Sequence, residues 1–188
     1  MGHRLFLLCL TAGGLLAMRG AVQSLLKIKG SPDAPEVLLF PPLIPLLTLL
    51  AGALLGRWLP QRLLARFGLG WRLGIGGLTA LAGIVIAGDG ARTLARAGTN
   101  INPSRPTLAV ATEGVFARTR NPLYVGGGLV LTGLAIGLAL DWVLLLLLPS
   151  FLLLHYGVVL PEERYLERKF GDLYRRYKAS VPRYGWRA

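Results

Sequence analysis

The sequence has few of the residues that build covalent or metal-centred chemistry. Its 188 residues include one cysteine, two histidines and nine acidic residues. The single cysteine, Cys9, excludes an intramolecular disulfide and a cysteine-based metal site, so we interpret it as a small packing residue. His3 and His155 are far apart in the sequence and form no ligand pair. We therefore expect neither a bound metal nor a covalent nucleophile.

Charge is also scarce, because charged residues make up 16% of the chain and hydrophobic residues 53%. Four long runs carry no charge at all: 37–56, 73–88, 122–140 and 142–160. A helix of about 20 apolar residues crosses the hydrocarbon core of a bilayer. The shortest run is long enough if its flanking Arg72 and Arg92 extend outward to the headgroups. The composition therefore predicts one domain, an all-α integral membrane protein.

The N-terminal segment 1–36 has more than one interpretation. Its apolar run, 5–18, is short and is followed by Arg19. A cleaved signal peptide needs small residues at its cleavage site, and Arg19 lies where they would be. We favour a fifth transmembrane helix reaching Leu26, with an interfacial or cleaved segment as the alternatives. The 37–96 region would then hold two further helices, and 121–160 the last two.

The formal net charge of +12 does not indicate a nucleic-acid partner. The basic residues flank the apolar runs, as the positive-inside tendency and anionic headgroups favour, and no nucleic-acid-binding motif accompanies them. The tail, 161–188, has the most Lys and Arg, so we expect it in the cytoplasm, in a bacterial inner membrane. Five spans would place the N-terminus and the 57–72 loop outside, although that loop contains four arginines, against the tendency.

The last two runs are joined by a turn whose only charged residue is Asp141. So short a connection forces an antiparallel helical hairpin. Arg120 and Glu162 therefore lie at the same membrane face, close together. We call these two ends of the hairpin, at Arg120 and at Glu162, its feet. Taken alone, each foot also resembles an ordinary helix boundary; Pro161 followed by Glu162, for example, is typical of a helix start.

The segment 97–120 between the second and third long runs is the longest polar stretch. Gly98, Pro103, Pro106 and Gly114 exclude a continuous helix there. Long loops in compact domains are often lids or binding segments. We expect this loop on the same side as the two feet of the hairpin.

The tail after Pro161 has the pattern of an amphipathic helix. Its apolar positions recur on one helical face: Leu166, Phe170, Leu173 and Tyr177. Such a helix either lies in the headgroup layer or closes over the polar loop. His155, inside the last apolar run, is a candidate functional residue or, more commonly, an interhelical hydrogen-bonding residue.

Four short motifs together resemble one known group of enzymes. They are Gly114-Val115-Phe116-Ala117-Arg118-Thr119-Arg120-Asn121-Pro122-Leu123-Tyr124-Val125-Gly126, then Glu162-Glu163-x-x-Leu166, Phe170-Gly171-x-x-Tyr174-x-x-Tyr177, and upstream Ala97-Gly98-Thr99-Asn100. In combination they resemble the isoprenylcysteine carboxyl methyltransferase and phospholipid methyltransferase superfamily. The resemblance covers roughly residues 40–184.

This resemblance implies a membrane-embedded methyltransferase that uses S-adenosylmethionine without a Rossmann domain. It implies catalytic roles for Arg120, Tyr124 and Glu163. It also implies the cofactor-binding residues Gly98, Thr99, Leu108, Ala109, Val110, Ala111, Phe116, Asn121, Pro122, Leu123, Tyr124, Glu162 and Glu163. The isoprenylcysteine enzymes usually have His where this chain has Asn121, which hydrogen-bonds but cannot titrate near neutral pH. That difference leaves the methyl acceptor open.

The residue types agree with methyl transfer. S-adenosylmethionine carries a sulfonium and an ammonium group, and a carboxylate pair is a suitable partner for them in a partly dry site. The acceptor is expected to be lipophilic or membrane-partitioning: a phospholipid amine, a prenylated thiol or carboxylate, or a small thiol. A non-enzymatic membrane scaffold or transporter component is the alternative from another class, although no series of intramembrane charges indicates a transport path.

Overall fold

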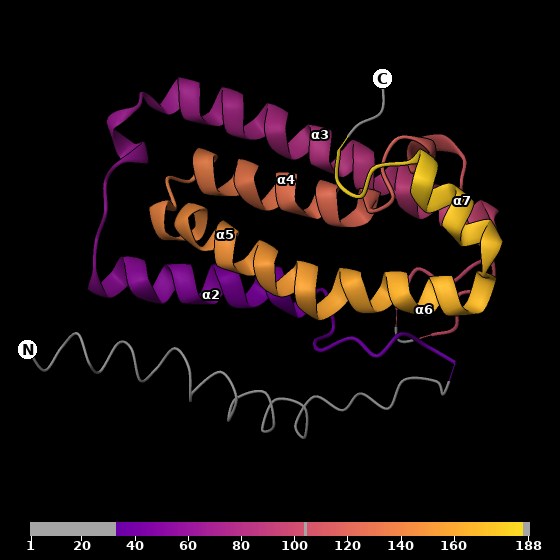
Figure 1. The fold of residues 1–188 in the computed structure, drawn as a ribbon. Helices are drawn as coiled ribbons and strands as arrows, with labels where there is room; N and C mark the ends of the chain where they lie inside the picture. The colour runs from indigo at the N-terminus through magenta and orange to yellow at the C-terminus, as the bar shows by residue number, and fades with distance from the viewer. Residues whose placement is uncertain (1–32, 104, 186–188) are drawn as a thin grey trace, which may run out of the picture.

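The computed structural model describes residues 33–103 and 105–185, and all regular structure in these residues is helical. Four helices form an antiparallel bundle (Figure 1): α2 (Leu43–Trp58), α3 (Leu69–Arg96), α4 (Pro122–Gly137) and α5 (Asp141–Leu154). Two shorter helices follow, α6 (Leu160–Phe170) and α7 (Asp172–Ser180). The all-helical prediction is therefore confirmed for this part of the chain. The predicted N-terminal helix and Cys9 lie outside the described residues.

Two of these helical stretches, Leu69–Arg96 and Asp141–Phe170, are long and apolar enough to cross a membrane, whereas α2 and α4 are shorter apolar helices. Only 11% and 22% of the residues in the apolar windows of the two long stretches are buried inside the protein. Leu78 and Leu148, for example, are mostly exposed. A helix that is apolar all round needs lipid or more protein to cover it. The exposed apolar faces thus fit a bilayer better than water.

Glycines set the close contact between α3 and α4. A Cβ atom on Gly76 would lie 2.6 Å from the carbonyl oxygen of Gly133, and one on Gly83 would lie 2.5 Å from that of Gly126. Small residues let helix backbones approach in this way in lipid. Gly133 lies in the same contact, since a Cβ on it would clash with the carbonyl oxygen of Gly76, whereas a Cβ on Gly137 would meet its nearest atoms only at van der Waals distance.

The last long run does not end at Pro161, where the pattern resembled a helix start. Helix α5 passes through a π-helical turn, η3 (His155–Val159), directly into α6. Pro161 has no N–H to donate to the carbonyl of Gly157, one turn earlier. That carbonyl instead accepts a hydrogen bond of 2.7 Å from Leu38 N. The freed backbone group therefore ties the segment before α2 to the helix.

The tail forms two helices rather than one, because Gly171 has a φ of 55° and interrupts the helical register. Leu173 of the predicted apolar face is consequently 49% exposed, and Tyr174 is buried with Tyr177 and Val181 instead. The tail closes over the polar loop, since the Tyr177 hydroxyl donates a 2.8 Å hydrogen bond to the carbonyl oxygen of Phe116.

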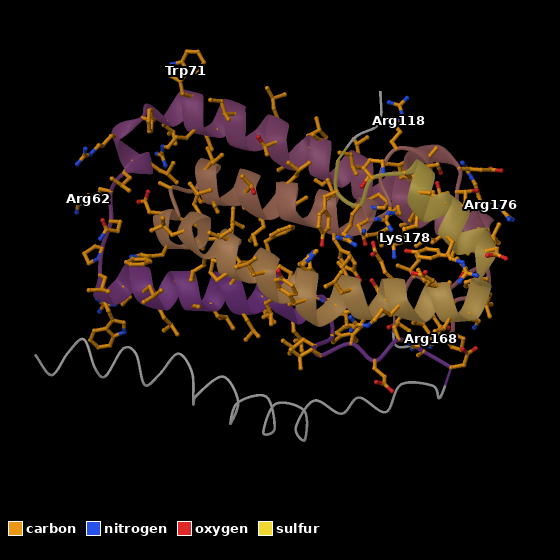
Figure 2. The ribbon with its side chains drawn as sticks, viewed as in Figure 1. Arg62, Trp71, Arg118, Arg168, Arg176 and Lys178 are labelled. Carbon is orange, nitrogen blue, oxygen red and sulfur yellow. The ribbon has the colours of Figure 1, made fainter. Side chains whose placement is uncertain are left out.

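The 57–72 connection lies at the end of the bundle opposite to α6 and α7. Figure 2 shows Arg62 and Trp71 at one end and Arg118, Arg168, Arg176 and Lys178 at the other. A short 3-10 helix, η1 (Leu64–Arg66), is held there by the Leu64 N–H, which donates to Asp141 Oδ1 at 2.8 Å. The sequence predicted the 57–72 loop and the tail on opposite sides of the membrane, and their positions at opposite ends of the bundle agree with that prediction.

Candidate functional site

The two feet of the α4–α5 hairpin meet in space, as the short turn required. The Tyr124 hydroxyl, in the first turn of α4, donates a hydrogen bond of 2.9 Å to Oε2 of Glu162 on α6. Arg120, just before α4, lies 2.9 Å from Glu163 Oε1. Residues about forty positions apart in the sequence thus form one polar cluster.

The two adjacent glutamates have different surroundings. Both oxygens of Glu163, which is 5% exposed, are in contact with arginines. Arg183 donates from Nε to Oε1 at 2.9 Å and from Nη2 to Oε2 at 2.7 Å. Glu162 accepts a hydrogen bond only at Oε2 from the described residues. Glu163 is therefore neutralised within the protein, whereas Glu162 has an oxygen left for a ligand.

Arg120 is buried with unused hydrogen-bonding capacity. Its side chain is 8% exposed, and within the described chain its Nε and Nη1 atoms have no hydrogen-bond partner. Nη1 is close to Glu163 Oε1 as an ion pair, although the geometry does not make a hydrogen bond. A buried donor without an acceptor is costly. The position therefore favours an anionic ligand group.

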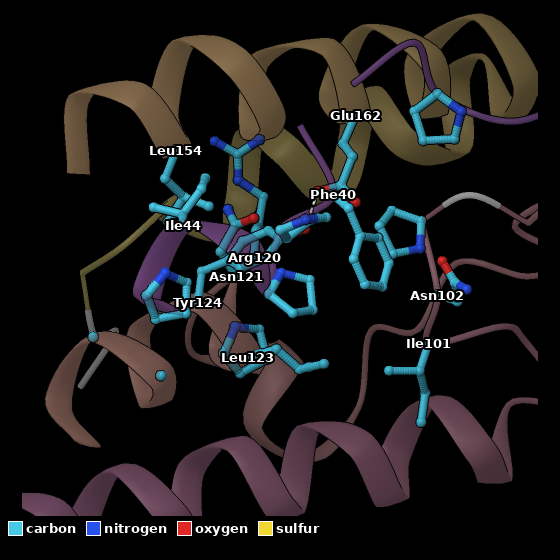
Figure 3. A pocket seen from close by; sticks show the side chains of 18 of the residues that line it. Phe40, Ile44, Ile101, Asn102, Arg120, Asn121, Leu123, Tyr124, Leu154 and Glu162 are labelled. Carbon is cyan, nitrogen blue, oxygen red and sulfur yellow. Dashed lines mark hydrogen bonds between the residues drawn. The ribbon is translucent and has the colours of Figure 1, made fainter. Parts of the chain in front are cut away.

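A cavity of about 770 Å³ adjoins this cluster, within the usual size range of small-molecule sites. Figure 3 shows Arg120, Asn121, Tyr124 and Glu162 near one another beside Phe40 and Ile44. The cavity continues between α2, α4 and α5, where its lining carries no charge and is mainly apolar, with three hydroxyl residues: Ile44, Pro45, Thr48, Leu131, Thr132, Leu147, Ser150, Phe151 and Leu154. One cavity thus joins a charged end to an apolar interior.

The C-terminal segment 181–185 closes the charged end. The backbone N–H of Arg120 donates to the carbonyl of Pro182 at 3.0 Å. The Thr119 hydroxyl and the Asn121 side-chain amide both donate to the carbonyl of Arg183, each at 3.1 Å. Nothing in the sequence pattern singled out Arg183, because the contact depends on how the tail folds back.

His155 makes a polar contact with the same C-terminal segment. Its Nδ1 atom lies 2.7 Å from the Tyr184 hydroxyl, and its ring packs beside that of Tyr184. Burial is the main cause that raises the pKa of Tyr184 to about 12, so its hydroxyl stays protonated at neutral pH. The hydrogen-bonding interpretation of His155 agrees with this contact, which joins the helix to the tail rather than to another transmembrane helix.

The predicted site residues fall into two groups. Those that border the cavity are Phe116, Arg120, Asn121, Pro122, Leu123, Tyr124, Glu162 and Glu163. Those that do not border it are Gly98, Thr99, Leu108, Ala109, Val110 and Ala111. The cavity is bordered by Asn100, Ile101, Asn102 and Pro103 instead. Asn100 was part of one of the motifs on which the resemblance rests, but nothing in the sequence marked Ile101, Asn102 or Pro103 as site residues.

Residues of the second group help to fold the loop that borders the cavity. Gly98 has a φ of 66° directly after α3, a conformation that glycine adopts readily. The Thr99 hydroxyl, in a buried residue, accepts a 2.8 Å hydrogen bond from Leu108 N and so holds the loop folded back. Ala111 packs with Val115 and Phe116, and Val110 packs against the tail cluster of Tyr174, Tyr177 and Val181.

Comparisons with known proteins found one match. The model of the phospholipid methyltransferase family matches residues 71–173. That region contains nearly all of α3, the polar loop and helices α4 to α6, and it excludes α2 and the segment 181–185. Searches of curated proteins and of solved structures returned no match. In the described residues no group of acidic, histidine or cysteine side chains is arranged to hold a metal.

Proposed function

The chain belongs to the phospholipid methyltransferase family, whose members are membrane methyltransferases, and on that premise we propose that it transfers a methyl group from S-adenosylmethionine to a lipophilic acceptor. The acceptor is a phospholipid amine, a prenylated thiol or carboxylate, or a small membrane-partitioning thiol. The observation that carries the proposal is the cavity that joins the Arg120–Glu162 cluster to an apolar interior. Such a cavity suits one substrate from water and one from lipid.

The charged end fits the amino-acid part of the cofactor. That part carries a carboxylate and an ammonium group, and the sulfonium next to it is also positive. Among the described residues, the buried Nε and Nη1 atoms of Arg120 have no hydrogen-bond acceptor, although Nη1 is ion-paired with Glu163, and one carboxylate oxygen of Glu162 accepts no hydrogen bond. Opposite charges of this kind form strong, charge-assisted hydrogen bonds in a partly dry site. Phe116 and Leu123 border the same cavity and supply apolar contacts.

S-adenosylmethionine supplies an activated methyl group when it is bound, and the protein contributes orientation and exclusion of water. Tyr124 fixes the position of Glu162 by donating to its Oε2 atom. Arg183 neutralises Glu163 and, with Pro182, closes the segment over Arg120. Correct placement of reacting groups lowers the barrier without any covalent intermediate. Tyr174 borders the cavity, and burial raises its pKa to about 12, so it serves as a neutral hydroxyl.

We place this end of the bundle in the cytoplasm. Most basic residues of the tail surround it, and Lys and Arg are enriched on cytoplasmic sides of membrane proteins. The cofactor would then enter from the cytosol, and the acceptor from the bilayer between the helices.

Calorimetry on purified protein tests the proposal. S-adenosylhomocysteine, the product form of the cofactor, is expected to bind, and Glu162→Gln to weaken binding by about tenfold or more, since a charge-assisted hydrogen bond is worth about 1.5–3 kcal/mol. Glu167→Gln is the matched control, because Glu167 lies on the same helix but pairs with Lys178. Absence of binding by the wild-type protein would favour a non-enzymatic membrane scaffold instead.

The acceptor can be identified by its chemistry. Membranes that contain the protein are incubated with methyl-labelled S-adenosylmethionine and separated into lipid, volatile and protein fractions. Label in the lipid fraction indicates a phospholipid amine or another lipid, whereas label in the volatile fraction indicates a small thiol. Label in the protein fraction indicates a prenylated protein.

A further inference from the structure

The apolar interior of the cavity contains one pair of facing hydroxyl groups, Thr48 on α2 and Ser150 on α5. Their oxygen atoms are 2.6 Å apart, and both residues border the cavity. The surrounding lining is apolar and includes Ile44, Leu131 and Leu147. Helix α2 lies outside the region that matches the family, 71–173. The family match therefore covers Ser150 but not Thr48.

The hydrogen atoms of the pair have a defined arrangement. The Thr48 hydroxyl donates to the carbonyl oxygen of Ile44 at 2.7 Å. A hydroxyl has one hydrogen to donate, so Ser150 is the donor in the contact with Thr48. Ser150 makes no other hydrogen bond in the described part of the chain. The lone pairs of its oxygen are thus available to accept a hydrogen bond from a ligand.

The pair lies well away from the charged end. Ser150 precedes Glu162 by 12 positions in the run of α5, η3 and α6, which has no break. At about 1.5 Å per residue this separation is about 18 Å. A ligand whose reactive group lies beside Glu162 therefore reaches Ser150 only with an extended chain.

We propose that the methyl acceptor is an amphiphile whose hydrocarbon chain carries a hydrogen-bond donor, such as a chain hydroxyl, that binds Ser150 Oγ. Ser150 is then a specificity-determining residue, and Thr48 is a positioning residue that fixes the hydrogen of Ser150. This proposal rests on the proposed function, because the same cavity holds both substrates. A polar oxygen in an apolar cavity that accepts no hydrogen bond is destabilising, and a ligand donor removes that cost.

The structural alternative is that the pair only ties α2 to α5. Ser and Thr hydroxyls commonly link helices in membranes. The two helices also pack closely elsewhere, since a Cβ on Gly52 would meet the backbone nitrogen of Val143 at 3.0 Å. If Ser150 binds the ligand, a hydroxyl on the ligand chain raises the affinity. If the pair only ties the two helices, that hydroxyl leaves the affinity unchanged.

Ricinoleic acid and oleic acid are the matched probes, because they differ in a single chain hydroxyl. Binding of each radiolabelled probe is measured on the full chain, in detergent, with S-adenosylhomocysteine present. Wild-type protein is expected to bind ricinoleate about threefold to tenfold more tightly, as one neutral hydrogen bond predicts. Ser150→Ala is expected to bring this ratio to about one while oleate affinity stays unchanged. Thr48→Val is expected to lower the ratio partly.

Thr79→Val is the control for the loss of a hydroxyl in a membrane helix. Thr79 makes the same kind of bond to its own helix, to the carbonyl of Ile75 at 2.8 Å, but does not border the cavity. This variant keeps the wild-type ratio. Equal affinities of wild-type protein for the two probes, or a ratio that survives Ser150→Ala, would overturn the inference. An equal loss of affinity for both probes in Ser150→Ala would mean that the pair only ties helices.

The outcome for the proposed function is read separately. If S-adenosylhomocysteine does not bind in the same preparation, the proposed function fails. If it binds and the probe ratio is one, only the assignment of Ser150 fails.

Discussion

The two ends of the helical bundle carry similar residues but use them differently. At the end formed by the 57–72 connection, side chains bind backbone groups: Asp141 accepts from Leu64 N, and Trp142 Nε1 donates to the carbonyl of Leu59 at 2.6 Å. At the other end, side chains bind backbone groups too, but they also bind one another, as in Tyr124 with Glu162 and Arg183 with Glu163. The first arrangement anchors a loop, with Asp141 Oδ2 left buried and without a hydrogen-bond partner among the described residues. The second leaves Arg120 and Glu162 with hydrogen-bonding capacity beside a cavity that can hold a ligand.

Enclosure is the feature that distinguishes a candidate ligand-binding end of the bundle from a charged helix end. Arginines beside an apolar span occur at both ends and by themselves indicate only a membrane boundary. At the site end, the segment 181–185 packs over the charges, and the loop 97–120 borders a cavity. Enclosure reduces the access of water, and electrostatic interactions are stronger where water is excluded. The same residue types are therefore anchors in one place and candidate ligand-binding groups in the other.

The largest effect is expected from Glu163→Gln at the site end. The change leaves Arg120 and Arg183 facing each other without the carboxylate between them. Removing one partner of a buried ion pair costs about 3–5 kcal/mol. We expect a clear fall in the apparent melting temperature and a loss of methyl transfer of about 100-fold or more. Thermal unfolding in detergent and labelled methyl transfer measure the two effects, and a fully active variant would contradict the proposed arrangement.

A smaller effect is expected from Arg183→Ala, which tests the enclosure itself. This change removes two hydrogen bonds to Glu163 but leaves the Arg120 contact in place. We expect weaker S-adenosylhomocysteine binding, by about tenfold, from the loss of charge-assisted hydrogen bonds. Arg175→Ala is the control, because Arg175 pairs with exposed Asp172, away from Glu163. If the two variants have equal affinity in calorimetry, the C-terminal segment does not contribute to the site.

The smallest effect is expected from Asp141→Asn at the opposite end. Asparagine keeps a side-chain oxygen that can accept from Leu64 N, so only the charge is lost. We expect unchanged methyl transfer and a change in stability of at most about 1 kcal/mol, the scale of a single hydrogen bond. A large loss of activity in this variant would mean that the two ends are coupled, and would contradict their separate roles.

Much of the fold could be predicted from the sequence. The apolar runs predicted the four bundle helices, because uncharged stretches of this length have few other stable arrangements. The boundaries were less accurate where local contacts decide them. Helix α2 begins at Leu43, after Pro41 and Pro42, so the uncharged run that starts at residue 37 is longer than the helix. Helix α3 continues past residue 88, where its uncharged run ends, and Asp89 Oδ2 accepts a hydrogen bond from Val115 N.

The candidate site could be predicted in part. The short turn at Asp141 predicted that Arg120 and Glu162 lie close together, and the motif resemblance included several of the residues that border the charged end of the cavity. It could not separate Glu162 from Glu163, since adjacent residues of one type look alike until their partners are known. Nor could it find Thr48, Ser150 or Arg183, which come from helix α2, the apolar part of α5 and the end of the tail.

The sequence by itself determined that the chain is helical, that its apolar runs suit a bilayer, and that polar feet meet at one end of a hairpin. These conclusions depend on composition and chain connectivity, which local sequence carries. The tertiary structure alone decided which carboxylate is neutralised, how the tail covers the site, and where the cavity extends. These features depend on contacts between residues far apart in the chain, such as Asn121 with Arg183 and Thr48 with Ser150.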